Sequence, residues 1–397
     1  MDPLRLALVG CGGISEAHVR GLEMLRKSSV DAVEVVATCD VVEDAATRRA
    51  RQISKFQKTK PRIYTQLDSM LQREDVEAVD ICTDHSTHHS VALRCIEEGR
   101  HVLVEKPVGI TIRAGRMMVR EAERKNLVLA VAENYRRSAQ NRAINWAIRS
   151  GRIGQPNLFF WHELSYWLGA WGWRHDKLKA GGGWILDGGV HLADLLLYNI
   201  GTVDAVFAVT KTLEPIRYED WPNKERPSPY TVEDVSMAVI EFECGASGVW
   251  TWSSVVPGEK LQRRLIAGSR GSIDWDLGLT EVGDGGATKT TPLDALIRQM
   301  LDEIDRDERE KLFPSGIGIE SPDFSSTVAL EILDFAEAVL EGTRPEVDGR
   351  LGLEAEAIPM AIYESSAVGR KLKVRDVLDL KVEDYQAPIN ESLGLLG

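Results

Sequence analysis

The sequence predicts a doubly wound α/β domain followed by an α+β domain with a mostly antiparallel sheet. The length of 397 residues suggests two domains, at about 150 residues each. The first third of the chain alternates short apolar runs with helical patterns, which is typical of a parallel sheet covered on both faces. After about residue 134, strand-like runs follow one another without helices between them, which favours antiparallel pairing. We therefore expect domains at 1–133 and 134–397.

The elements of the first domain are read from its apolar runs. Strands are expected at 4–9, 33–39, 78–82, 101–104 and 127–132, and helices at 42–54, 88–98 and 112–125. Right-handed crossovers between such strands give a doubly wound sheet.

The second domain carries two kinds of pattern. Helices are expected at 138–149, 186–200, 293–308, 327–341 and 353–370, and strands at 203–212, 235–242, 247–252, 261–267 and 272–275. Loops are expected in the proline-rich segment 215–230 and at 280–291 and 312–326. The tail from residue 382 shows no clear pattern.

Composition excludes several classes of protein. Lys and Arg number 48 against 61 Asp and Glu, a net charge of −13, which argues against nucleic acid as a partner. No apolar run reaches the roughly 18 residues of a membrane span, and the N-terminus lacks a signal-peptide pattern. The five cysteines form no CxxC pair, so we expect neither a disulfide framework nor a zinc site, and a reducing, cytoplasmic location.

A dinucleotide-binding fingerprint follows the first strand. The run Gly10-Cys11-Gly12-Gly13-Ile14-Ser15 stands between an apolar run and a helical pattern, which is the context this motif requires. Gly10 permits a tight turn, Gly12 lets the backbone approach a pyrophosphate, and the helix N-terminus offers N–H groups. Ser15 replaces the third glycine of the motif. The alternative interpretation is a tight turn without a ligand.

Asp40 ends the second expected strand. A carboxylate there can accept hydrogen bonds from both ribose hydroxyls and repels a 2′-phosphate, which favours NAD over NADP. The alternative is that Asp40 caps the following helix. The two roles are compatible.

Two further segments carry groups suited to alcohol chemistry. Lys106 follows the fourth strand, at the edge where ligands lie in this fold, and can donate a hydrogen bond to a hydroxyl or carbonyl oxygen. Asp187 and His191 are four residues apart on an expected helix and share a face, and a neutral imidazole can remove an alcohol proton. The alternatives are a surface lysine and a histidine without a special role. A metal site with Asp194 is disfavoured, because no further His or Cys cluster supports it.

Six of the ten tryptophans lie between positions 146 and 184. Aromatic side chains fill large cores, but they also line pockets that bind ring-shaped ligands. We divide the tryptophans from Trp161 to Trp184 between core and substrate cleft without assigning members.

Together these motifs resemble the Gfo/Idh/MocA family, named for glucose–fructose oxidoreductase, inositol dehydrogenase and a rhizopine-catabolism protein. The resemblance spans nearly the whole chain. It includes Cys82-Thr83 followed by His88, the runs 99–107, 133–136 and 150–154, Trp173-Arg174, and the blocks 181–194, 349–353 and 361–365. The chain departs at Asp84-His85, where many members carry Pro-Asn, and in long segments at 213–231 and 280–325.

The resemblance implies an NAD-binding Rossmann domain and a C-terminal domain whose large open sheet lines the substrate cleft and forms a homo-dimer or homo-tetramer. It implies that Lys106, Asp187 and His191 face the nicotinamide, and we expect these three residues to be catalytic. The expected cofactor-binding residues are Gly10, Gly12, Gly13, Ile14, Asp40, Thr83, His88, Glu105, Lys106, Asn134 and Arg174. The expected substrate-binding residues are Tyr135, Arg136, Trp173, Asp187 and His191.

The expected function is NAD-dependent hydride transfer to or from a secondary alcohol of a sugar, glycoside or cyclitol. His191 would take the hydroxyl proton, Lys106 would polarise the oxygen, and Asp187 would orient His191 or bind a neighbouring hydroxyl. One alternative is a redox-neutral enzyme that uses tightly bound NAD transiently to cleave a glycoside or to eliminate from it. Another is a non-catalytic nucleotide-binding regulator, which predicts loss of the base and the lysine. No metal, nucleic acid or membrane is expected as a partner.

Overall fold

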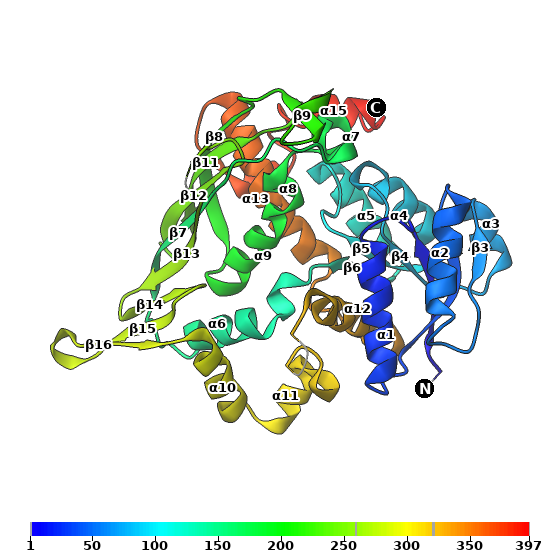
Figure 1. Ribbon diagram of the computed structural model, residues 1–397, viewed down its shortest axis with the longest axis horizontal. Coiled ribbons are helices and arrows are strands. Elements are labelled where there is room, and N and C mark those ends of the chain that lie inside the picture. Colours follow the sequence, from blue (N-terminus) through cyan, green and yellow to red (C-terminus); the bar gives the residue numbers. More distant parts are fainter. Residues whose placement is uncertain (1, 259, 320–321, 397) are drawn as a thin grey trace. The chain divides into compact units, whose positions relative to one another are not determined.

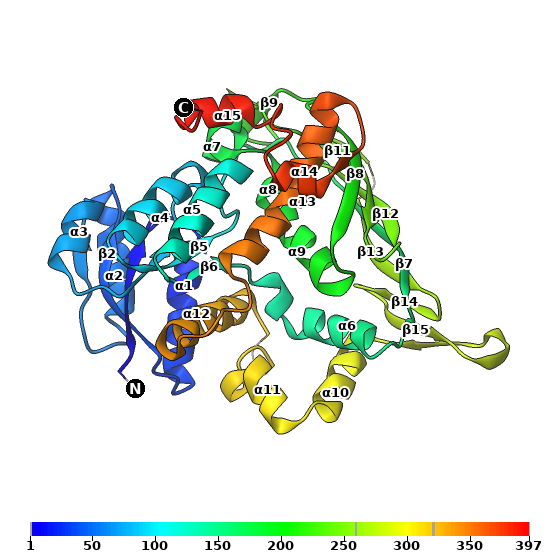
Figure 2. The same ribbon diagram turned by 180° about the vertical axis from the view of Figure 1, so that it is seen from behind.

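A computed structural model describes residues 2–258, 260–319 and 322–396 (Figures 1 and 2). The chain divides into two compact units. Unit 1 comprises Met1–Gly109, Arg113–Ser138 and Arg306–Leu353, and unit 2 comprises Ile110–Ile112, Ala139–Asp305 and Glu354–Gly397. The expected domain boundary between residues 133 and 134 stays a prediction. Packing assigns the distant segment Arg306–Leu353 to unit 1.

Unit 1 is built on a six-stranded parallel sheet of order β3-β2-β1-β4-β5-β6, which confirms the predicted doubly wound fold. Its strands are β1 (Leu4–Val9), β2 (Val33–Cys39), β3 (Arg62–Tyr64), β4 (Ala78–Ile81), β5 (His101–Glu105) and β6 (Leu129–Ala132). Its helices are α1 (Ser15–Lys27), α2 (Glu43–Ile53), α3 (Leu67–Arg73), α4 (His88–Glu97), α5 (Ile112–Arg124), α11 (Arg306–Leu312) and α12 (Phe324–Glu341).

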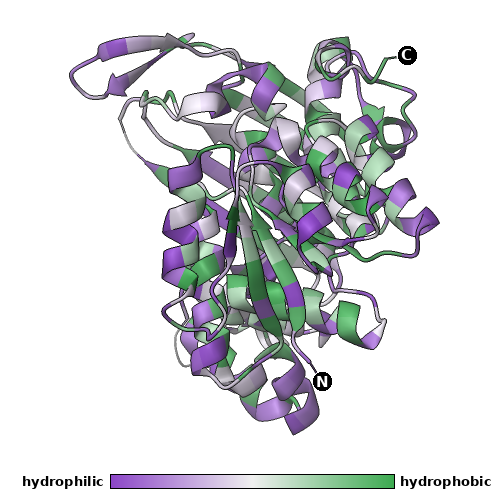
Figure 3. Cartoon of the chain, turned by 90° about the vertical axis from the view of Figure 1, so that its right-hand side faces the viewer, coloured by the Kyte–Doolittle hydropathy of each residue, from purple (hydrophilic) through white to green (hydrophobic). Residues whose placement is uncertain are grey.

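Close packing against α12 shapes the first helix of unit 1. A Cβ on Gly21 of α1 would lie 2.9 Å from the backbone nitrogen of Ala329 of α12, so the two helices meet almost backbone to backbone. Apart from the edge strand β3, the strands between the helix layers are mostly buried and hydrophobic, as the green ribbons beside the N-terminus in Figure 3 show. This rigid sheet holds the loops that follow its strands.

Unit 2 is built on a nine-stranded sheet of order β16-β15-β14-β13-β7-β12-β11-β8-β17, in which only the β7–β12 pair is parallel among the described residues. Its strands are β7 (Pro156–Leu164), β8 (Val203–Lys211), β11 (Val235–Phe242), β12 (Ser247–Ser253), β13 (Leu261–Gly268), β14 (Gly271–Asp274), β15 (Gly278–Val282), β16 (Thr288–Thr291) and β17 (Leu372–Lys373). The predicted α+β domain is thus confirmed. Its helices are α6 (Ala139–Arg149), α7 (Lys177–Ala180), α8 (Trp184–Asp187), α9 (Gly189–Asn199), α10 (Leu293–Glu303), α13 (Gly349–Val368), α14 (Val374–Leu378) and α15 (Ala387–Ser392).

The two faces of this sheet differ. Trp161 of β7 and Trp250 of β12 pair in register on the inner face and are 2% and 1% exposed. On the outer face, Phe207, Val239 and Phe160 lie in one cross-strand row and are exposed. Side chains alternate between faces along each strand, so the sheet has a buried aromatic face and an uncovered apolar one.

Several expected elements were wrong in detail. The proline-rich segment 215–230 is not a loop, because β9 (Ile216–Asp220) and β10 (Glu225–Pro229) pair there as a separate hairpin. Proline is tolerated in such an edge strand, since it need not donate to a neighbour on its outer side. The polar segment 280–291 likewise extends the sheet as β15 and β16. The expected helix 293–308 is two helices, and α15 lies in the patternless tail.

The short strand β3 was missed, because three largely exposed residues leave no apolar run. Among the residues that the structure describes, no helix combines the length and the apolar stretch that crossing a membrane requires.

Candidate functional site

The glycine turn after β1 has the geometry of a phosphate cradle. Gly10 has a φ of +85°, and a Cβ there would lie 2.6 Å from the backbone of Cys82, so only glycine fits this turn. Around Gly12 and Gly13, by contrast, a Cβ would meet no described atom within 4 Å. The open side of the turn faces the N-terminal end of α1, where backbone N–H groups and the helix dipole favour an anion.

Asp40 and Arg49 hold this turn in place. One oxygen of Asp40 accepts the N–H of Cys11 at 2.7 Å, and the other accepts the N–H of Val42 at 2.8 Å. From α2, Arg49 donates to the carbonyl of Gly12 at 2.6 Å and to the hydroxyl of Ser15 at 2.9 Å. Asp40 therefore has a structural role beside the glycine turn, at the position expected of a ribose acceptor. Arg49 gave no signal in the sequence, because it lies in a run of helical arginines.

A buried histidine supports the segment that carries Lys106. His18 of α1 lies between two carboxylates, with Nδ1 2.8 Å from Asp80 and Nε2 3.0 Å from Glu105. The other oxygen of Glu105 accepts the backbone N–H of Lys106 at 3.1 Å. Burial opposes protonation of His18, but the charge of Asp80 and of its neighbours holds its pKa well above the usual value. His18 also forms, with Asp80 and Cys82, a buried cluster of potential cation ligands, which the sequence did not single out.

His88 fixes the next residue of the same segment. Its Nδ1 lies 2.8 Å from the carbonyl oxygen of Pro107, which follows a cis Lys106–Pro107 bond, and its Nε2 lies 3.3 Å from the carbonyl of Thr83. Burial lowers the pKa of His88 to about 4, so it is neutral near pH 7. His88 thus ties together two segments that the sequence assigned to the cofactor.

Other residues expected at the site have partners within unit 1. Asn134 donates from its amide to the hydroxyl of Thr327 at 2.8 Å, and Arg136 lies 3.8 Å from a carboxylate oxygen of Glu346. Both side chains are buried.

Unit 2 carries a candidate site of its own at a glycine-rich turn. A Cβ on Gly183 would lie 2.8 Å from the carbonyl oxygen of Glu233, and one on Gly188 would overlap the ring of Trp184. Asp187 ends α8, and His191 lies in α9, beyond a break at Gly188. The single expected helix at 186–200 is therefore two helices, the first of which begins at Trp184. Both Asp187 and His191 are buried.

Glu233 holds this turn and was missed by the sequence analysis. Its two carboxylate oxygens accept the N–H groups of Gly183 at 2.7 Å and of Ile185 at 2.9 Å. Burial raises the pKa of Glu233 to about 7, although both hydrogen bonds favour the ionised form. No local pattern marks it, because about fifty residues separate it from the turn it supports.

Arg174 orients Asp187. Its Nε donates to Oδ2 of Asp187 at 2.9 Å, and its guanidinium lies over the rings of Trp173, at 4.3 Å, and Trp171, at 4.9 Å. Three residues expected at the site, Trp173, Arg174 and Asp187, are thus brought together. The nearby His175 is neutral, since burial and the charge of Arg217 lower its pKa to about 4.

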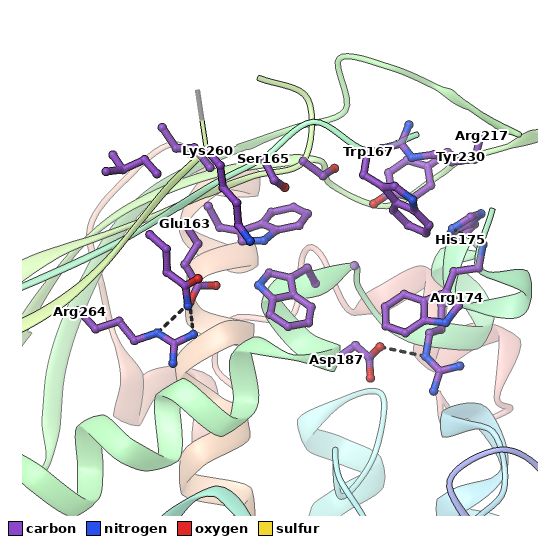
Figure 4. A pocket seen from close by; sticks show the side chains of 18 residues that line it. Glu163, Ser165, Trp167, Arg174, His175, Asp187, Arg217, Tyr230, Lys260 and Arg264 are labelled. Atoms are coloured by element: carbon purple, nitrogen blue, oxygen red, sulfur yellow. Dashed lines mark hydrogen bonds and ion pairs between the residues drawn. The ribbon is translucent and has the colours of Figure 1, made fainter. Parts of the chain in front are cut away.

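Trp171, Arg174, His175 and Asp187 border a cavity of about 410 Å³ in unit 2 (Figure 4). Arg174 and Asp187 lie at one end, and an ion pair between Glu163 and Arg264 lies at the other. Among the tryptophans whose role the sequence left open, Trp161 belongs to the core, whereas Trp167, Trp171 and Trp184 line the cavity. Mostly apolar pockets of about 300–1,000 Å³ with a few placed polar groups are typical ligand sites.

Comparison with protein families decides the relationship. The family model described as an oxidoreductase family with an NAD-binding Rossmann fold matches residues 4–133, and the GFO/IDH/MocA C-terminal domain matches residues 141–274. The chain belongs to the Gfo/Idh/MocA family. It is an oxidoreductase, and the recognised motifs led to the correct family.

Several relatives of this oxidoreductase match over most of its length. D-apiose dehydrogenase of Paraburkholderia graminis is 24% identical, covering 94% of this chain and 90% of the relative. Levoglucosan dehydrogenase of Pseudarthrobacter phenanthrenivorans is 27% identical, over 75% and 80%. Myo-inositol 2-dehydrogenase of Thermotoga maritima is 24% identical, over 94% and 100%.

The fold is also that of solved structures. A levoglucosan dehydrogenase in complex with NADH and L-sorbose aligns with a TM-score of 0.78 at 24% identity, covering 94% of this chain and 99% of that one. An oxidoreductase domain protein from Kribbella flavida aligns with a TM-score of 0.79 at 23% identity, over 94% and 100%.

Proposed function

We propose that this oxidoreductase uses NAD to oxidise a secondary alcohol of a sugar, glycoside or cyclitol. The observation that carries the proposal is the cavity of unit 2, in which Asp187, bound to Arg174, lies among indole rings and polar side chains. Such a lining suits a ring with apolar C–H faces and hydroxyls at its edges. The three relatives above are named as dehydrogenases of D-apiose, levoglucosan and myo-inositol, which favours net oxidation over the redox-neutral alternative.

The catalytic roles follow from the chemistry of the side chains. Bound NAD supplies the hydride acceptor. His191 accepts the hydroxyl proton at an imidazole nitrogen, and Lys106 donates from Nζ to the same oxygen. Asp187, which accepts from Nε of Arg174 at Oδ2, orients the imidazole or accepts from a neighbouring hydroxyl. The hydrogen bond from the backbone N–H of Lys106 to the carboxylate of Glu105 holds the backbone of Lys106 in place.

The cofactor site is proposed on the glycine turn and the loops beside it. The open space around Gly12 and Gly13 fits a pyrophosphate, and Asp40 beside the turn fits a ribose with two free hydroxyls, which favours NAD over NADP. The proposed cofactor-binding residues are Gly10, Gly12, Gly13, Ile14, Asp40, Thr83, His88, Glu105, Lys106, Asn134 and Arg174. The proposed substrate-binding residues are Tyr135, Arg136, Trp173, Asp187 and His191.

The test is a spectrophotometric screen for NADH formation with free sugars, methyl glycosides and inositols. We expect turnover with at least one substrate, with a higher kcat/KM for NAD than for NADP. Replacing both His191 and Lys106 by alanine should lower kcat by at least about 10²-fold, the usual contribution of a positioned acid or base. Absence of turnover across the panel would refute the proposal, and full activity of the double variant would refute the assigned roles. Release of an aglycone without net NADH would indicate the redox-neutral reaction instead.

We also propose that the outer face of the nine-stranded sheet joins copies of this chain into a dimer or tetramer. The exposed row of Phe207, Val239 and Phe160 is continuous across the sheet, and contiguous apolar patches of this kind mark protein interfaces. The five cysteines are free, which supports a reducing, cytoplasmic location.

A further inference from the structure

The cavity in unit 2 extends beyond the end that carries Asp187. Its floor is one face of three neighbouring strands, β12, β7 and β13, and its residues follow the strand register. Glu163 of β7 is paired with Trp252 of β12 on one side and with Gln262 of β13 on the other. Neighbouring strands lie about 4.8 Å apart, so this row is roughly 10 Å long. That length exceeds a single pyranose ring.

Alternation along the strands adds polar groups to the same face. Ser165 and Ser254 follow Glu163 and Trp252 by two residues, and Arg264 follows Gln262; all three of these residues line the cavity. One row further along the same face, Arg264 is paired with Trp161 and Trp161 with Trp250, and both tryptophans are buried beside the floor. The floor therefore carries hydroxyl, amide, carboxylate and guanidinium groups on a rigid sheet.

Two ion pairs lie at the ends of this cavity, and the exposed side chain of Lys260 lines it as well. Arg264 donates to Oε1 of Glu163 from two nitrogens, with Nε at 2.8 Å, and both side chains are largely shielded from solvent. At the opposite end, Arg174 neutralises Asp187 in the same way. Two neutralised pairs suit hydroxyl groups, which both donate and accept, better than they suit an anion.

Stacked indoles connect the two ends. Trp184 belongs to the same short helix as Asp187, and Trp252 belongs to the same row as Glu163. Their rings stack at 6.1 Å with an interplanar angle of 27°. The two indoles thus form an apolar wall between one polar end of the cavity and the other.

We infer that the substrate is a glycoside with a second, neutral, hydroxyl-bearing ring, and that the Glu163–Arg264 end of the cavity binds this second ring. The inference rests on the proposed function for the Asp187 end. The reacting sugar occupies that end, the indole wall contacts the linkage, and Gln262 and Glu163 bind hydroxyls of the second ring. A one-ring substrate leaves these polar groups to water.

The experiment compares matched substrates with one reacting sugar. The first set consists of D-glucose, methyl β-D-glucopyranoside and cellobiose. The second set consists of the corresponding α-glucosides and maltose, and the third consists of the corresponding galactosides and lactose. Initial rates of NADH formation give kcat/KM, and calorimetric titration of each sugar gives Kd without turnover. In at least one set, we expect the disaccharide to exceed the methyl glycoside about tenfold in kcat/KM and in affinity.

Variants locate the effect. Gln262→Ala, at an exposed position, should lower kcat/KM for the disaccharide at least fivefold more than for the methyl glycoside. Arg263→Ala is the control, because its side chain lies on the opposite face of the same strand and outside the cavity, and it should leave that ratio unchanged. Equal losses on both substrates in Gln262→Ala would overturn the inference.

The outcomes separate the two proposals. If kcat/KM for a free sugar or methyl glycoside equals or exceeds that for every disaccharide, the second-ring site is refuted and the proposed dehydrogenase activity still holds. Tight disaccharide binding without NADH formation supports the second-ring site and counts against the dehydrogenase. If no sugar of the three sets is either bound or oxidised, the inference is overturned.

Discussion

Replacing Glu233 by glutamine should remove a pH dependence from the stability of unit 2. The carboxylate is buried and bound to the N–H groups of Gly183 and Ile185, and burial raises its pKa from 4.5 to about 7. The folded protein therefore holds this proton more tightly than the unfolded chain does. The stability from this group is present below pH 4.5 and is lost as the pH rises through 7.

The magnitude follows from the size of the shift. One pKa unit corresponds to about 1.4 kcal/mol, so a shift of this size lowers the free energy of unfolding by roughly 2–3 kcal/mol between pH 5 and 8. Glutamine cannot titrate, so the difference in unfolding free energy between wild type and Glu233→Gln should change by that amount over the same range.

Urea titrations of both proteins at pH 5, 6, 7 and 8, followed by tryptophan fluorescence, would measure this difference in the free energy of unfolding. The ten tryptophans all lie within Ala139–Asp305 of unit 2, so the signal reports on the unit that contains Glu233. Parallel pH profiles for the two proteins would refute the reasoning.

Three further outcomes are expected. Gly12→Ala should leave the melting temperature within about 1 °C of wild type and weaken NADH binding at least tenfold, as measured by fluorescence titration. Gly10→Ala should destabilise unit 1 by about 1–3 kcal/mol, because Gly10 has a positive φ and a Cβ there would overlap the backbone. Equal behaviour of the two variants would contradict this division of roles. Gly188→Ala forces a methyl group into the ring of Trp184 and should cost about 1–3 kcal/mol in urea titrations, so an unchanged midpoint would count against this packing. Val239→Glu should reduce the mass measured by light scattering to that of a smaller assembly, and an unchanged mass would argue against the sheet face as the interface.

Strong local signals explain what the sequence predicted well. The strands at 4–9, 33–39 and 235–242 were predicted with their observed bounds, because each is a continuous or alternating apolar run. The glycine turn was recognisable because its residues are contiguous and each glycine has a separate geometric reason.

What the sequence did not reveal depends on contacts between distant residues. Glu233 matters only because folding brings it to Gly183, and Arg49 only because α2 packs beside the glycine turn. The hairpin of β9 and β10 was hidden by its prolines, which are breakers inside a sheet but not in an isolated pair. Helical periodicity compares neighbours three or four residues apart, so it is blind to all three features.

The strand-built floor of the cavity bears on how substrate preference can change in relatives of this enzyme. Asp187 is held by a turn and by Glu233, whereas Glu163 and Gln262 project from strands whose backbone pairing does not depend on their side chains. Alternate positions of β7 and β13 can therefore be exchanged without moving the residues proposed as acid and base. A single substitution at such a position changes which groups line the cavity and leaves the turn that holds Asp187 in place.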